Sequence, residues 1–147
     1  MGGMKMPKFI KMKKIIPNKI GKKYFPIYDP IFGRRIHVLL NFEMKDYESW
    51  LNRRKIKDIS LKNFDDFAGF STTIETQGGQ TELVIFQRRF NWAIKCQGTL
   101  IHEITHTVVK IFNHNNIPFT TETQEFFAHM ISRIYEEVAL KLLVKIK

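Results

Sequence analysis

The chain has 147 residues, of which 44% are hydrophobic and 26% charged, and its formal net charge is +10. This length and composition indicate one globular domain and exclude a disordered chain. No run of 18 apolar residues occurs, so we expect neither a transmembrane span nor a membrane partner. The first residues lack the continuous apolar stretch of a secretory signal, and the single cysteine, Cys96, suits a reducing compartment. We therefore expect a cytoplasmic protein.

Residues 1–26 are predicted to form a basic arm and residues 27–147 the folded domain. Eight lysines precede the first acidic residue, Asp29: Lys5, Lys8, Lys11, Lys13, Lys14, Lys19, Lys22 and Lys23. Without them the formal charge falls from +10 to +2. Two interpretations of the arm stay open. It could contact nucleic acid or another polyanion through phosphate groups, or it could be a solvated leader that docks loosely on the domain.

The first half of the domain is predicted to contain three strands and one helix. Residues 35–42 (RIHVLLNF) are mostly apolar, as in a buried strand, and residues 44–57 carry apolar side chains at helical spacing. Residues 68–76 and 81–87 are predicted to be two strands of a hairpin that turns at Gly78 and Gly79. We expect residues 81–87 to be the exposed edge to which an extended peptide would add.

The next segment is predicted to be a helix that begins at Gly98 or Thr99 and carries His-Glu-Ile-Thr-His at residues 102–106. Positions i and i+4 lie on the same face of a helix, so His102 and His106 can bind one metal ion. Two imidazoles and an adjacent carboxylate, here Glu103, are typical of zinc hydrolases. The alternative is a core helix whose two histidines are satisfied by other contacts.

A second helix is predicted from residue 121 to about residue 143, with a capping box at Thr121 and Gln124. Glu125 lies 19 residues after His106, a separation that two antiparallel helices can close, and it is the expected third metal ligand. Glu122 is the reserve candidate. The alternative for Glu125 is a solvated carboxylate in the first turn, favoured there by the helix dipole.

The segment GTLIHEITHTVV, followed by TQEFFAHMIS, resembles the small zinc metallopeptidases encoded by bacteriophages and prophages. These combine an HExxH helix with a later acidic residue in a motif similar to DEAFAY. The resemblance covers about residues 27–137. It implies a minimal gluzincin-like α+β domain, with a small, mostly antiparallel sheet packed on helices. It also implies Zn²⁺ at His102, His106 and Glu125, and a location in the host cytoplasm or the virion. His129 stands where the family often has tyrosine.

We therefore expect a peptidase in which a zinc-activated water attacks a peptide or protein substrate and Glu103 is the general base. His129 is the favoured additional catalytic donor for the oxyanion because it shares a helix face with Glu125, and Tyr135 and His114 are alternatives. Two other classes stay open. One is a non-catalytic phage structural or binding protein with a structural zinc site. The other is a nucleic-acid-associated protein that acts through its basic arm.

Overall fold

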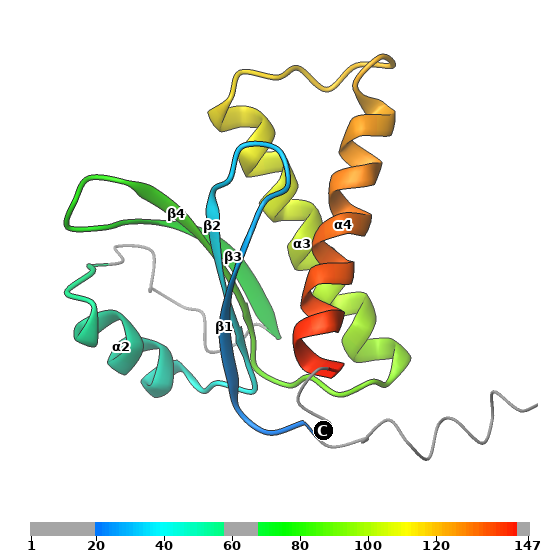
Figure 1. Ribbon diagram of the computed structural model, residues 1–147. Helices are drawn as coiled ribbons and strands as arrows, with labels where there is room; N and C mark the ends of the chain where they lie inside the picture. The colour runs from blue at the N-terminus through cyan, green and yellow to red at the C-terminus, as the bar shows by residue number, and fades with distance from the viewer. Residues whose placement is uncertain (1–19, 58–67, 144–147) are drawn as a thin grey trace, which may run out of the picture.

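The computed structural model describes residues 20–57 and 68–143, and its centre is a mixed four-stranded sheet (Figure 1). The strands are β1 (Lys23–Tyr28), β2 (Arg35–Leu40), β3 (Gly69–Glu75) and β4 (Thr81–Gln87). Their order in the sheet is β1-β2-β4-β3. β1 pairs with β2 and β3 with β4 in antiparallel fashion, whereas β2 and β4 are parallel.

Helices cover both faces of this sheet. α2 (Met44–Arg53) lies on one face, and α3 (Ile94–His114) and α4 (Gln124–Leu143) lie on the other (Figure 1). Side chains alternate along a strand, so Val38 and Leu40 of β2 join the core under α3 and α4, whereas Leu39 joins the core under α2. The prediction of an α+β domain with a small sheet packed on helices is confirmed.

Apolar burial holds the layers together. Within the described residues, the core on the α3–α4 side includes Ile36, Ile85, Ile104, Val108 and Ile134, all with 0% exposed surface. The smaller core on the α2 side is built around Tyr47 and Trp50, with 0% and 1% exposed. Each buried aliphatic side chain contributes roughly 1.5–3 kcal/mol relative to an exposed one, so burial between the helices and the sheet is a large contribution to the stability of this fold.

The folded domain begins earlier than predicted. Lys23 pairs with Leu40 and Pro26 pairs with His37, so the expected boundary between residues 26 and 27 falls inside β1. Phe25 and Ile27 are buried in the core, which explains why this segment joins the sheet. Pro26 is tolerated because β1 is an edge strand. The rest of the arm, residues 1–19, lies outside the described residues.

The predicted hairpin is confirmed, but the expectation that residues 81–87 form an edge is wrong. β4 lies between β2 and β3, and β3 is the edge strand on that side. The parallel pairing of β4 with β2 is the cause, because it places β4 inside the sheet. At the turn, Gly79 has a φ of 78°, a conformation that favours glycine, and the Thr76 N–H donates to the Gln80 carbonyl at 2.8 Å.

Both C-terminal helices are present, and α4 ends at Leu143 as predicted, but the starts of both helices differ from the prediction. α3 begins at Ile94, so Gly98 and Thr99 lie inside it. Before α4, the capping pair is Thr120 with Thr123, one residue away from the expected pair. The Thr120 N–H donates to Thr123 Oγ1 at 2.8 Å, and the Thr123 N–H donates to Thr120 Oγ1 at 3.3 Å.

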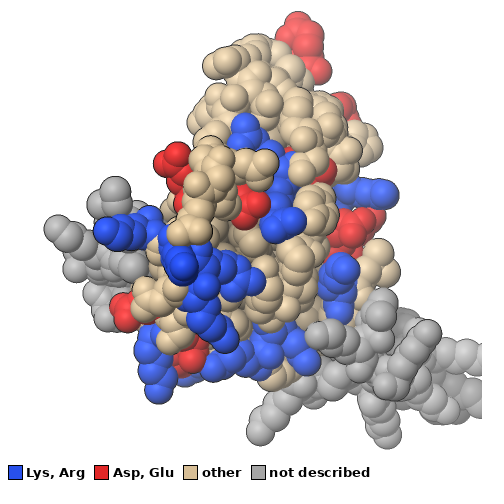
Figure 2. Space-filling model, turned by 60° about the vertical axis from the view of Figure 1, so that its left-hand side comes forward, with Lys and Arg blue, Asp and Glu red and all other residues tan. Residues whose placement is uncertain are grey.

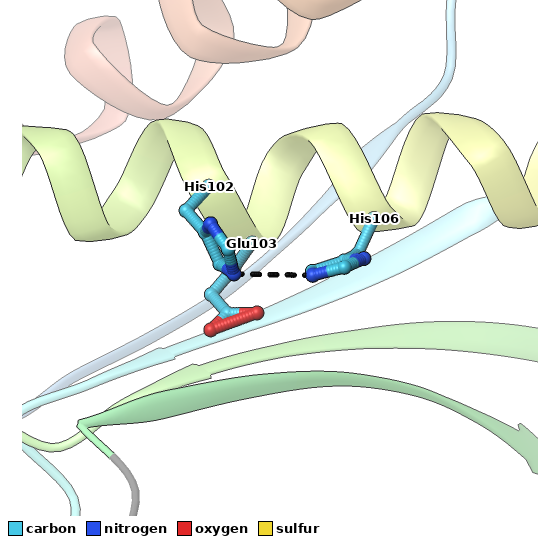
Figure 3. Close-up of side chains that lie close together, drawn as sticks. All are labelled: His102, Glu103 and His106. Atoms are coloured by element: carbon cyan, nitrogen blue, oxygen red, sulfur yellow. Dashed lines mark hydrogen bonds between the residues drawn. The ribbon is translucent and has the colours of Figure 1, made fainter.

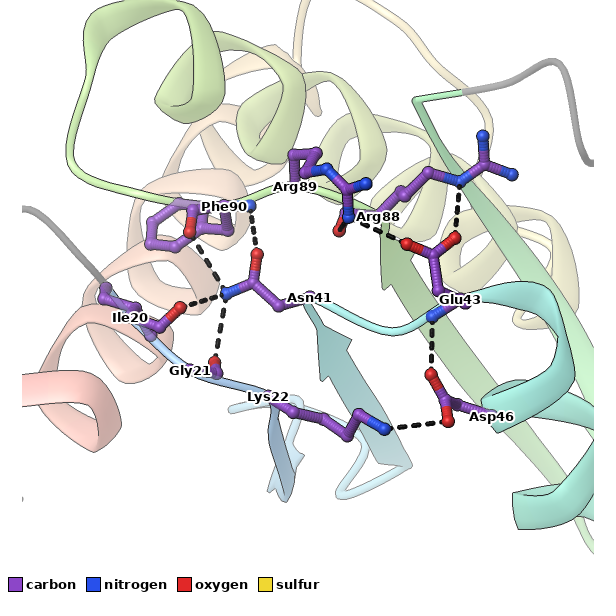
Figure 4. A network of polar contacts seen from close by, with 9 residues as sticks. All are labelled: Ile20, Gly21, Lys22, Asn41, Glu43, Asp46, Arg88, Arg89 and Phe90. Carbon is purple, nitrogen blue, oxygen red and sulfur yellow. Dashed lines mark hydrogen bonds and ion pairs between the residues drawn. The ribbon is translucent and has the colours of Figure 1, made fainter.

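Asn41, directly after β2, links the start of β1 to the segment that enters α3 (Figure 4). Its Nδ2 donates to the carbonyls of Ile20 at 2.7 Å and Phe90 at 3.1 Å, and its Oδ1 accepts from the Phe90 N–H at 2.8 Å. Asn41 has a φ of 62°, a conformation that asparagine adopts more readily than most residues. One side chain thus connects three segments that are distant in the sequence.

We predict that Asn41→Ala lowers the free energy of unfolding by about 2–4 kcal/mol, because several hydrogen bonds are lost and alanine is disfavoured at positive φ. Urea unfolding followed by circular dichroism measures the change. Asn52→Ala, at an exposed position of α2, is the matched control and should change stability by less than about 0.5 kcal/mol. Equal effects of the two substitutions would contradict this role of Asn41.

Candidate metal centre

The two histidines of the HExxH motif lie together on α3. His102 Nε2 and His106 Nε2 are 3.1 Å apart, and both side chains are exposed. Figure 3 shows both rings and the Glu103 side chain projecting from α3 on the side where the strands lie. One ligand atom from each of these three residues lies within 4.8 Å of the others, which is close enough for one metal ion.

The packing of α3 explains this arrangement. Ile104 is fully buried, and the two histidines precede and follow it by two residues. At about 100° per residue, a two-residue step leads to the opposite side of a helix. Burial of Ile104 therefore turns His102 and His106 away from the core, while Glu103, one residue from Ile104, points toward the sheet.

Glu103 is buried, with 5% of its surface exposed, and it lies against β3 at Gly69. A Cβ atom on Gly69 would be 3.3 Å from Glu103 Oε2 and 2.6 Å from the carbonyl oxygen of Phe86. Thr107 fixes α3 here, because its Oγ1 donates to the Glu103 carbonyl at 2.9 Å and shares a 2.8 Å hydrogen bond with Ser71 Oγ. The glycine thus leaves room for the carboxylate beside the strand.

Burial raises the pKa of Glu103, and the nearby positive charges of His102 and Lys110 oppose that rise. Burial also lowers the pKa of His106, and the charges of His102 and Lys110 lower it further. The neutral imidazole is the form that binds metal. A carboxyl group with raised pKa holds a proton more readily than an exposed one, which suits a general base.

An open cleft runs along α3 and the edge strand β3. One hollow of about 480 Å³ is lined by Ala68, Lys95, Gly98 and Thr99, and a second of about 280 Å³ is lined by Phe70, Ser71, His106 and Lys110. Gly69, His102 and Glu103 line both hollows. The histidines and the carboxylate are therefore accessible to a ligand that lies along β3.

The structure does not bring Glu125 to this group. Glu125 lies in the first turn of α4, its side chain is 89% exposed, and its Oε2 is 3.8 Å from His129 Nε2. The adjacent residues Phe126 and Phe127 pack on Phe112, which is six residues beyond His106 on α3. Glu125 thus lies near the end of α3, and its role as third ligand stays a prediction. Glu122 is also exposed and precedes α4.

The expected oxyanion donors also lie away from the cleft lining. His129 is 81% exposed beside Glu125, and the Tyr135 hydroxyl donates to Gln97 Oε1 at 2.6 Å. His114 is in the last turn of α3. Lys110, which lines the cleft four residues after His106, was not predicted as a site residue. Its spacing of i+4 from His106 would have placed it on the same helix face.

Comparison with protein-family models, with curated proteins and with solved structures finds no match for this chain. Among the described residues, none of the helices has both the length and the apolar character needed to span a membrane. The assignment of a function therefore depends on the geometry of the HExxH group.

We predict that Gly69→Ala lowers the free energy of unfolding by about 1–3 kcal/mol, because its Cβ would overlap the Phe86 carbonyl and press on Glu103. Thermal and urea unfolding measure the change. Gly78→Ala is the matched control, since the nearest atom to its added Cβ is Thr76 Oγ1 at 3.9 Å. A Gly69→Ala protein as stable as the Gly78→Ala protein would show that β3 and α3 are less closely packed than described.

Proposed function

We propose that this chain is a zinc-dependent metallopeptidase with a minimal zincin-like domain. The observation that carries the proposal is the pair of histidine nitrogens 3.1 Å apart beside the buried Glu103 carboxylate. Nitrogen ligands 2.0–2.1 Å from a tetrahedral zinc ion lie about 3.3 Å from one another. The donor atoms and their separation therefore fit zinc.

The open cleft favours a catalytic centre over a structural one. Structural zinc sites are closed by four protein ligands, whereas catalytic sites keep a position open. Here both imidazoles are exposed, and the three grouped residues include only two imidazoles. Glu125 remains the proposed third ligand, and its exposed carboxylate would have to reach the histidines from the first turn of α4.

A zinc ion at this site would act as a Lewis acid and lower the pKa of a water molecule. Glu103 would accept a proton from the attacking water on its carboxylate and donate it to the leaving amine. The raised pKa of Glu103 supports this role, because it brings the affinity of the carboxylate for a proton closer to neutral pH. His102 and His106 would hold the metal through their imidazole nitrogens.

The edge strand β3 gives a place for the substrate. β3 pairs with β4 on one side, and it borders the cleft at Gly69, Phe70 and Ser71. An extended peptide could bind along β3, the outermost strand of the described sheet on this side, in place of the expected addition to residues 81–87. Since a reducing compartment suits the single Cys96, we place the enzyme in the cytoplasm, which is the host cytoplasm if the protein is phage-encoded.

We predict that the purified protein binds about one zinc ion per chain, and that His102→Ala and His106→Ala each abolish stoichiometric binding. Inductively coupled plasma mass spectrometry after gel filtration measures the ratio. His114→Ala, on the same helix but outside the cleft lining, is the matched control and should keep its zinc. If the double variant, in which both His102 and His106 are replaced by alanine, still bound one zinc ion per chain, the assigned site would be refuted.

The same measurement tests the third ligand. If Glu125 binds zinc, Glu125→Ala should weaken zinc affinity by at least about tenfold, and Glu122→Ala should leave it unchanged. A larger loss with Glu122→Ala would transfer the role to Glu122. If both variants bound zinc with unchanged affinity, neither Glu125 nor Glu122 would be a zinc ligand.

We predict that Glu103→Gln retains zinc and the fold but lowers the hydrolysis rate by about 10²–10⁴-fold, because it removes proton transfer. The rate is followed with a library of internally quenched peptides incubated with the zinc-loaded protein. Glu48→Gln, at an exposed position of α2, should cleave at the wild-type rate. If Glu103→Gln cleaves as fast as wild type, the general base is another group.

A further inference from the structure

Two lysines line the cleft beyond the histidines, one in each direction along α3. Lys95 lines the larger hollow, and Lys110 lines the smaller one together with His106. Residues 95, 102, 106 and 110 are separated by seven, four and four positions, so they lie on one face of the helix. Positive side chains thus flank the candidate metal centre on both sides.

Neither lysine forms a salt bridge with a carboxylate in the part of the chain that the structure describes, although the charges of Lys110 and Glu103 attract each other across the cleft lining. No ion pair within residues 20–57 and 68–143 includes Lys95 or Lys110. Glu103 is the single acidic residue among the described residues that line the two hollows. A bound divalent cation would add further positive charge. Clefts lined by charges of one sign attract ligands of the opposite sign.

We infer that the cleft selects acidic peptides, with carboxylate side chains of the substrate bound by Lys95 and Lys110. This inference rests on the proposed function for the position of the scissile bond, but acidic binding is measurable without cleavage. Residue 104 is midway between the two histidines. At a rise of 1.5 Å per residue, the backbone of Lys110 is about 9 Å and that of Lys95 about 13 Å from it along the helix axis. An extended peptide advances about 3.3 Å per residue. The acidic residues would therefore lie about three residues from the scissile bond on one side and about four on the other.

Basic side chains outside the cleft could also attract acidic peptides, so the test needs a control for them. Basic side chains also cover much of the lower part of the face shown in Figure 2, with acidic side chains among them, and the predicted arm is basic. A general attraction for acidic peptides would arise from all of these groups. Lys45 is an exposed lysine on α2, on the opposite face of the sheet, so Lys45→Gln is a matched control for Lys95→Gln and Lys110→Gln.

The test uses two fluorescein-labelled peptides of equal length with the same apolar centre, one flanked by glutamates and the other by glutamines. Their binding to the full-length, EDTA-treated protein is measured by fluorescence anisotropy. We expect wild type to bind the glutamate peptide more tightly. Lys95→Gln and Lys110→Gln should each weaken that binding by about two- to fivefold, with little effect on the glutamine peptide. At about 0.5 M salt, where the Debye length is about 4 Å, the preference should largely disappear.

Equal affinity of wild type for the two peptides would overturn the inference. The inference would also be overturned if Lys45→Gln weakened binding of the glutamate peptide as much as Lys95→Gln and Lys110→Gln do. Because the assay contains no metal and needs no cleavage, its outcome is independent of the proposed function. A protein that binds no zinc and still prefers the glutamate peptide through Lys95 and Lys110 would keep the acidic-peptide site and lose the peptidase assignment.

Discussion

Leu100, Ile104, Val108 and Ile111 form the buried face of α3, and their packing against the sheet sets the rotation of this helix about its axis. Each contributes roughly 1.5–3 kcal/mol through burial, so a rotation that exposed all four would cost about 6–12 kcal/mol, which is comparable to the whole stability of a typical domain. The directions of the remaining side chains follow from this constraint. His102 and His106 face the open cleft. Glu103 lies between these histidines and the core, and its side chain is directed toward β3.

The burial of Glu103 links stability to the proposed chemistry. Transfer of a carboxylate away from water disfavours its charged form, and the raised pKa of Glu103 reflects this cost. Gly69 makes the arrangement possible, because a larger residue on β3 would overlap the Phe86 carbonyl and crowd the carboxylate. The cleft thus combines a buried carboxyl group, two accessible imidazoles and flanking lysines. In our proposals the imidazoles bind the metal and the lysines bind an acidic peptide.

Local patterns predicted the hairpin and the HExxH face, because turn residues and i, i+4 spacing act within a few positions. β1 was missed since Pro26 and the preceding lysines obscure the alternation of Phe25 and Ile27. The interior position of β4 depends on its parallel pairing with β2, which no local pattern encodes. The place of Glu125 depends on how the segment between α3 and α4 turns and on the packing of the α4 phenylalanines, both of which are tertiary features.

Zinc K-edge X-ray absorption of the metal-loaded protein tests the central claim most directly, because it reports which atoms bind the metal. The account predicts a first shell with two imidazole nitrogens at about 2.0–2.1 Å and oxygen ligands in the remaining positions. A shell without imidazole, or one with a sulfur ligand at about 2.3 Å from Cys96, would contradict the assignment of the centre to His102 and His106.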